Sequence, residues 1–193
     1  MEVAQVNLHH ASAASAVIVK RFISDNLSIL LIQEPWVFRG EVRGLNTSNS
    51  KVIWDLSSER PRSCVVVRAD IDFFCISEFL TQDLVAVQVK DKEVSDFVMA
   101  SAYFPGETAT APPPSILSLV EYCRANNLPL TLGCDANAHH TEWGSTDCNV
   151  RDDPERSSAD NADAPFFRGT AGNGVVMTAI LIFFFLKMLQ NVY

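Results

Sequence analysis

The stretch Ile29-Leu30-Leu31-Ile32-Gln33-Glu34-Pro35-Trp36 decides how this chain folds. Its four consecutive branched apolar residues form too short a run for a helix and are typical of a strand buried on both faces. Pro35 ends the strand, because proline lacks the backbone N–H of a sheet ladder and restricts the residue before it. The sequence therefore places Glu34 at the carboxyl end of a buried strand.

Segments before and after this strand predict a mixed α/β domain. Residues 11–23 predict a helix with Ser12 as its N-cap, and a second helix opens at Ser115 because apolar residues recur there at helical spacing. Residues 39–50 carry Gly, Asn, Thr and Ser and predict a loop. Further strands are predicted at 3–8, 51–54, 64–68, 73–76, 84–89, 97–104 and 129–134. This order favours an α/β sandwich over a simple βαβ alternation.

Composition and charge restrict the classes of function. A length of 193 residues with 48% hydrophobic and 20% charged residues is ordinary for one globular domain. The net charge of −8 argues against a protein that grips nucleic acid mainly through phosphate contacts. Five cysteines without a C-x-x-C pair indicate reduced thiols and an intracellular setting, and no secretory signal is expected because the first residues lack a basic region.

Polar residues with catalytic chemistry follow four of the predicted strands. They are Asn7, Glu34, Tyr103 and, after the last strand, Asp135 with Asn137. Each alone has an ordinary explanation as a turn, capping or rim residue. Because ligands in α/β sheets bind beyond the carboxyl ends of strands, their coincidence predicts one shared site.

The motifs around these residues resemble the endonuclease domain of jockey-type non-LTR retrotransposons, a member of the endonuclease/exonuclease/phosphatase superfamily. The resemblance covers residues 1–149. It is carried by Val6-Asn7-Leu8, Gln33-Glu34-Pro35-Trp36, Arg60-Pro61-Arg62, Ser101-Ala102-Tyr103-Phe104-Pro105, Gly133-Cys134-Asp135-Ala136-Asn137-Ala138-His139-His140 and Trp143-Gly144-Ser145. It implies a two-sheet α/β sandwich of that type, incomplete at the C-terminus.

The resemblance also implies roles for the site residues. Glu34 and Asn7 would hold Mg²⁺, with Mn²⁺ as the alternative, and Asn7 would also act in catalysis. Asp135 would position and deprotonate the attacking water, while Asn137 and Tyr103 would contact phosphate oxygens. The implied partner is target DNA, with a reverse transcriptase in an intact parent polyprotein and a nuclear location.

The resemblance ends near residue 149. The family continues to a Ser-Asp-His motif, but no histidine follows His140 here. Residues 150–193 are therefore expected to be an unrelated polar segment and an apolar tail, and the chain alone is expected to show little nicking of plasmid DNA. The apolar run at 175–186 favours a buried or sticky segment over a membrane anchor.

Three alternatives stay open. Cys134, His139, His140 and Cys148 offer zinc ligands, although their spacing lacks the usual pairs. A lipid phosphodiesterase would keep the superfamily and change the substrate. A decayed, non-catalytic retrotransposon fragment would explain the missing histidine.

Overall fold

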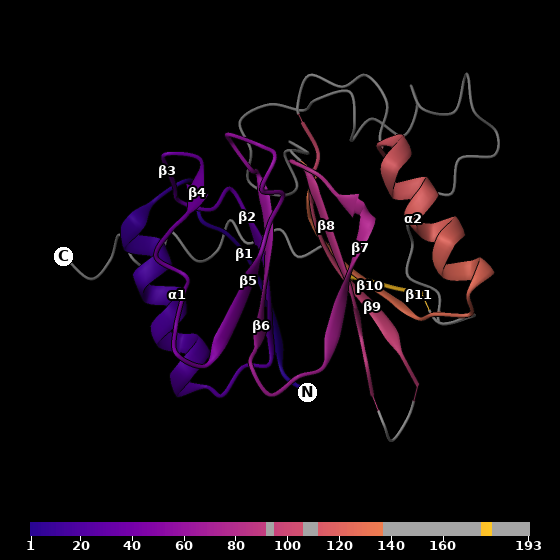
Figure 1. Ribbon diagram of the computed structural model, residues 1–193, viewed down its shortest axis with the longest axis horizontal. Coiled ribbons are helices and arrows are strands. Elements are labelled where there is room, and N and C mark those ends of the chain that lie inside the picture. The colour runs from indigo at the N-terminus through magenta and orange to yellow at the C-terminus, as the bar shows by residue number, and fades with distance from the viewer. Residues whose placement is uncertain (92–94, 106–111, 137–174, 179–193) are drawn as a thin grey trace, which may run out of the picture.

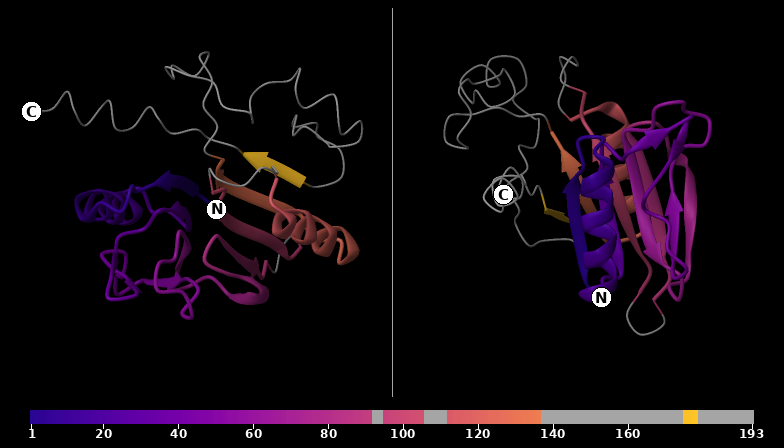
Figure 2. Two further views of the ribbon diagram at one scale, coloured as in Figure 1. Left: turned by 90° about the horizontal axis from the view of Figure 1, so that it is seen from above. Right: turned by 90° about the vertical axis from the view of Figure 1, so that its left-hand side faces the viewer.

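Two β-sheets pack face to face, and one helix covers the outer face of each sheet (Figures 1 and 2). The computed structural model describes residues 1–91, 95–105, 112–136 and 175–178. The first sheet has the order β1 (Val3–Asn7), β2 (Ile29–Gln33), β6 (Ser63–Arg68) and β5 (Ser50–Ile53). The second has the order β11 (Val175–Thr178), β10 (Leu130–Asp135), β9 (Phe97–Tyr103), β8 (Leu84–Val89) and β7 (Phe73–Leu80). The predicted α/β sandwich is confirmed.

Alternation along β2 shows how the sequence builds the layers. Leu31 packs between the two sheets, in a cluster with Val65 of β6 and Val87 of β8. Its neighbours Leu30 and Ile32 face the other way, toward helix α1 (Ser12–Ser24). A strand with apolar residues at every position fits here because both of its faces are covered. Burial of each such side chain contributes on the order of 1.5–3 kcal/mol to folding.

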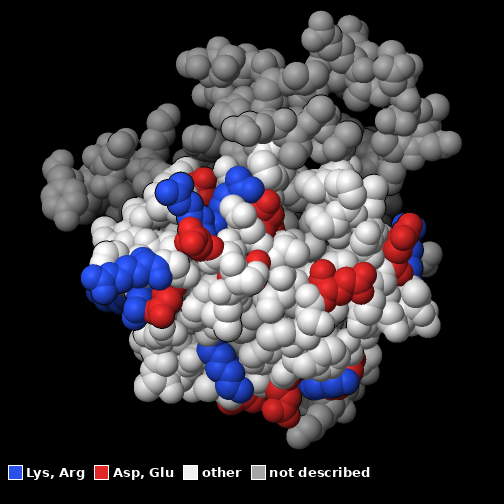
Figure 3. Space-filling model, turned by 45° about the horizontal axis from the view of Figure 1, so that its top comes forward, with Lys and Arg blue, Asp and Glu red and all other residues white. Residues whose placement is uncertain are grey.

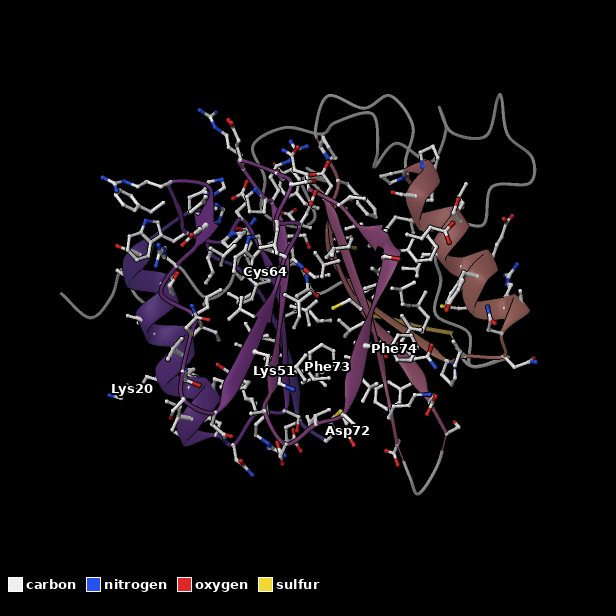
Figure 4. The ribbon with its side chains drawn as sticks, viewed as in Figure 1. Lys20, Lys51, Cys64, Asp72, Phe73 and Phe74 are labelled. Carbon is white, nitrogen blue, oxygen red and sulfur yellow. The ribbon has the colours of Figure 1, made fainter. Side chains whose placement is uncertain are left out.

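The second sheet is covered in the same way by helix α2 (Pro114–Ala125). Ile116, Leu119 and Cys123 of this helix are buried against Leu130 and Leu132 of β10. The predicted apolar stripe is thereby confirmed, and the helix begins at Pro114, because proline suits the first helical position. On the open side of the sandwich, Lys51 of β5 lies over the Phe73 ring of β7, with Nζ 5.3 Å from the ring centroid (Figure 4).

Three expectations need correction. Ser12 is the first residue of α1 rather than its N-cap, because Ala11 occupies that position and no side chain caps the helix. The predicted loop at 39–50 contains part of a hairpin formed by β3 (Val37–Phe38) and β4 (Glu41–Val42), since Arg39 and Gly40 both adopt the positive φ of a tight two-residue turn. Strand β7 continues past residue 76, across an irregularity in its pairing with β8.

The apolar run near the end of the chain begins with β11, which pairs parallel with β10 from Leu130 to Gly133. Within the described ranges the structure contains no helix that is long and apolar enough to cross a membrane. The other residues of the run, 179–186, lie outside the described ranges.

Candidate active site

Four predicted site residues lie at strand ends on the same side of the sandwich. Asn7 ends β1 and Glu34 follows β2, and these two strands are parallel neighbours. Tyr103 and Asp135 end β9 and β10, which are also parallel and pair with each other at these two residues. The carboxyl ends of each strand pair therefore meet at one edge of each sheet. Asn137, His139 and His140 lie outside the described residues.

A hydrogen bond joins the two sheets at this edge. The Asn7 side-chain amide donates from Nδ2 to Asp135 Oδ2 at 2.5 Å, across 128 positions of sequence. A bond this short between an amide and a carboxylate is charge-assisted and holds the carboxylate in a fixed orientation. The structure thus brings residues of both sheets together, as predicted.

Glu34 is fixed through its backbone on both sides. Its N–H donates to the carbonyl of Arg62 at 2.8 Å, and its own carbonyl accepts from the N–H of His10 at 2.8 Å. Its φ of +48° lies in the left-handed region that residues with a side chain rarely adopt. Such strained residues persist where the surroundings over-determine them, and they cluster at functional sites. The backbone geometry therefore supports a functional role for Glu34.

His9 links the two carboxylates and is a residue that sequence reasoning missed. Its Nδ1 lies 3.2 Å from Glu34 Oε2, and its backbone N–H donates to Asn7 Oδ1 at 2.7 Å. A continuous set of contacts consequently runs from Glu34 through His9 and Asn7 to Asp135. The available signal was the position of His9, only two residues beyond Asn7 at the same strand end.

Tyr103 is supported by a second pair that the sequence did not reveal. The Arg62 guanidinium donates twice to the Asp83 carboxylate, at 2.6 and 2.7 Å, and its carbon lies 5.0 Å from the centre of the Tyr103 ring. The Tyr103 N–H also donates to the Asp83 carbonyl at 2.8 Å. A planar guanidinium held by two hydrogen bonds along one edge is a stable platform for an aromatic ring.

Comparisons with solved structures identify the fold. The structure is similar to the endonuclease domain of TRAS1, a telomere-specific non-LTR retrotransposon, with 27% identity over 77% of this chain and 64% of that one and a TM-score of 0.59. The chain has the endonuclease/exonuclease/phosphatase fold. The predicted resemblance to the endonuclease of a non-LTR retrotransposon is confirmed.

Two family proteins of this fold also match. One from Leptotrichia buccalis is 11% identical over 75% of this chain and 69% of its own, with a TM-score of 0.48. One from Bacteroides thetaiotaomicron is 15% identical over 72% and 64%, with a TM-score of 0.49. No protein-family model matches the sequence, and no curated protein matches it significantly. The chain spans 64% of the length of the TRAS1 domain.

The donor atoms of this candidate site are of the kind that suits a hard cation. The described residues contain no cluster of three or more His, Cys, Asp or Glu that could hold a metal. Mg²⁺ does not require such a cluster, because it keeps several waters and takes one or two carboxylates together with substrate phosphate. Glu34, whose side chain is 18% exposed, offers a carboxylate of this kind, and its partner His9 also contacts Asn7.

Cys134 is poorly suited to the alternative zinc site. It belongs to the core cluster that packs beneath α2 and is 9% exposed. Burial, and then the charge of Asp135, raise the pKa of its thiol to about 11. Zinc binds the thiolate, which this environment disfavours. The other residues of that alternative, His139, His140 and Cys148, lie outside the described residues.

Charges of both signs are interspersed on the face shown in Figure 3. Among the described residues, Arg62 pairs with Asp83 and Arg43 pairs with Glu41. The face consequently shows no continuous basic surface, in agreement with the net charge of −8.

Proposed function

We propose that this site hydrolyses phosphodiester bonds of DNA with the help of a bound Mg²⁺ or Mn²⁺ ion, as one step of retrotransposition. The observation that carries the proposal is the set of contacts from Glu34 through His9 and Asn7 to Asp135. Two carboxylates from different sheets lie at the same end of the sandwich, and the Asn7 amide between them donates to Asp135 and accepts from the backbone of His9, whose ring contacts Glu34. The similarity to the TRAS1 endonuclease domain supports DNA as the substrate.

Each residue has a distinct role in the proposed reaction. Glu34 holds the cation, and Asn7 keeps a free lone pair on Oδ1 with which it can contact the ion as well. When bound, the ion neutralises phosphate charge and stabilises the leaving oxygen. Asp135, whose carboxylate is oriented by the Asn7 amide, positions the attacking water and accepts its proton.

The remaining groups contact the phosphate. The Tyr103 phenol donates to a phosphate oxygen from the second sheet, and the Arg62 platform fixes the position of its ring. Asn137 adds a donor where charge develops on the phosphate. We further propose a nuclear location and a reverse transcriptase partner within a longer parent protein.

We also propose that the 193-residue polypeptide nicks DNA slowly. The Ser-Asp-His motif of the resembled family has no counterpart after His140 in this sequence. Active-site residues act as a unit, so the loss of one member removes most of the rate even when the others are in place.

The test compares the chain with a repaired chimaera. In the chimaera, the residues after Ala136 are replaced by the corresponding segment of the TRAS1 endonuclease domain, and both proteins are incubated with supercoiled plasmid in Mg²⁺ or Mn²⁺. We expect nicking by the chimaera, at least about 100-fold slower after Glu34→Gln or Asp135→Asn. A chimaera that nicks equally well with either substitution contradicts the proposed site. Fast nicking by the unmodified chain contradicts only the proposed impairment.

A further inference from the structure

Three buried polar side chains and one half-buried one connect the two sheets beneath the candidate site. They are Gln5, Gln33, Ser63 and Ser101, and we call them the inter-sheet bridge. We propose that the inter-sheet bridge sets the separation and register of the sheets and thereby positions the two halves of the site. The catalytic role of the site rests on the proposed function. The positioning of its residues by the inter-sheet bridge can be tested without catalysis.

Three members of the bridge share one hydrogen-bond network. The Gln33 amide donates from Nε2 to Ser101 Oγ at 3.0 Å and to the Gly133 carbonyl at 3.2 Å. Ser63 Oγ donates to Ser101 Oγ at 2.8 Å, and Ser101 Oγ donates to the Ile32 carbonyl at 2.8 Å. Gln33, Ser63 and Ser101 are fully buried. Every one of these bonds except the one between Gln33 and Gly133 uses the Ser101 hydroxyl.

Gln5 adds a second crossing on the other side of β2. Its Nε2 donates to the Cys134 carbonyl at 2.8 Å and lies 3.3 Å from Gln33 Oε1. Its own Oε1 is buried and has no hydrogen-bond partner among the described residues. A buried acceptor without a partner costs on the order of 1–3 kcal/mol. The inter-sheet bridge therefore includes one atom, Gln5 Oε1, that lowers the stability of the fold.

Bridge residues stand next to site residues in the chain. Gln33 immediately precedes Glu34, and the Cys134 carbonyl that Gln5 holds belongs to the residue before Asp135. Residues two apart in a strand point to the same face. Gln5 thus shares its face with Asn7, two positions on. A shift of a bridge residue should therefore move the site residue next to it in the chain.

Stability alone does not explain a polar bridge at this position. The rest of the interface between the sheets is apolar, formed by residues such as Ile29, Val67 and Val89. Replacing a buried hydrogen-bonded pair by apolar groups of the same shape is often neutral or stabilising. Hydrogen bonds are directional, however, and a satisfied buried network specifies one arrangement where apolar surfaces can slide.

The test measures the Asn7–Asp135 hydrogen bond in the full chain by NMR, without metal or DNA. The Asn7 side-chain amide should resonate downfield and exchange slowly in the unmodified protein, since it donates to a carboxylate at 2.5 Å. We expect Gln33→Met to abolish this shift and this protection. Ser101→Ala, a smaller change, should reduce both. The matched control is Gln88→Met, because Gln88 is also buried on a strand but donates to Asp96, outside the bridge.

A second measurement connects the bridge to the proposed function. Mn²⁺ affinity, measured by water-proton relaxation, should fall about 10- to 100-fold in Gln33→Met and remain unchanged in Gln88→Met. If the unmodified chain binds no Mn²⁺, the proposed function fails while the NMR result still decides the positioning. An unchanged Asn7 resonance in Gln33→Met and Ser101→Ala would overturn the inference. So would a loss of folding in Ser101→Ala, because the bridge would then be a device for stability.

Discussion

Glu34 adopts a left-handed backbone conformation, and the strain of this conformation can be measured by substitution. A left-handed conformation costs a residue with a Cβ roughly 1–2 kcal/mol, a penalty that glycine does not incur. We expect Glu34→Gly to have a free energy of unfolding about 1 kcal/mol higher than Glu34→Ala, because both lose the carboxylate and only alanine keeps the strain. Urea unfolding of the two variants provides the comparison.

An exposed helical position supplies the control for this measurement. Glu121 lies in α2 and is exposed. There the order should reverse, with Glu121→Ala more stable than Glu121→Gly by about 1 kcal/mol. If Glu34→Gly is no more stable than Glu34→Ala, the left-handed backbone carries no strain and its link to function is lost.

Arg62 offers a test of guanidinium geometry. Lysine keeps the charge of arginine but cannot donate twice in one plane or stack on an aromatic ring in the same way. Arg62→Lys should lower the free energy of unfolding by about 1 kcal/mol, since the pair with Asp83 is only about one-third exposed and the guanidinium also lies over Tyr103. Arg43→Lys is the matched control, because its pair with Glu41 is about half exposed and should contribute at most about 0.5 kcal/mol. Equal losses in urea unfolding would show that the stacked, bidentate geometry contributes nothing.

At the scale of elements, the longer strands of the two sheets up to residue 135 could be predicted and their partners could not. The run Ile29–Ile32 and the alternation around it are local patterns, and the structure confirms a strand at each predicted position. The hairpin at β3 and β4 was missed because its turn needs a positive φ at Arg39, a residue that does not signal one. Left-handed geometry at such a position is set by tertiary contacts rather than by propensity.

The site, too, combines residues that a local sequence pattern predicts with contacts between residues far apart in the chain. Asn7, Glu34, Tyr103 and Asp135 were predicted as site residues because each stands where an apolar run ends. The contact from Gln33 to Ser101 spans 68 positions, and no local pattern distinguishes a glutamine that crosses between sheets from one that faces solvent. Sequence therefore predicts which residues reach the edge of a sheet, and only the packed sheets show which of them touch.

Close approach of the sheets depends on Gly133. A Cβ at this position would lie 2.9 Å from Leu31 Cδ1, 3.1 Å from Leu31 Cβ and 3.0 Å from Gln5 Oε1. Gly133→Ala should therefore lower the free energy of unfolding by about 1–3 kcal/mol.

A double-mutant cycle with Leu31→Ala tests the cause of this loss. Removing the Leu31 side chain beyond Cβ clears the nearest contact, so the double variant should be more stable than the sum of the single changes by about 1 kcal/mol. Strict additivity would mean that Gly133 is needed for some reason other than the separation of the sheets.

At the scale of the whole molecule, charge opposes the proposed substrate. A chain with a net charge of −8 repels the phosphate backbone, and the face in Figure 3 has no continuous basic surface to offset that repulsion. Binding of DNA should then depend on a divalent cation held at Glu34. We expect fluorescence anisotropy of a labelled duplex to show association in Mg²⁺ or Mn²⁺ and almost none in EDTA.

The salt dependence of DNA binding distinguishes a few phosphate contacts at one site from many contacts over a basic surface. A protein that neutralises Z phosphates loses affinity with a slope of about −0.9Z in log K against log salt. A site that contacts the duplex through one cation and a few side chains should give a shallow slope, on the order of −2 to −3. Glu34→Gln should remove the effect of the cation, whereas the control Glu121→Gln, on the exposed face of α2, should leave it intact. Cation-independent binding with a slope near −6 or steeper would contradict this prediction, because the cation at Glu34 would no longer explain the affinity.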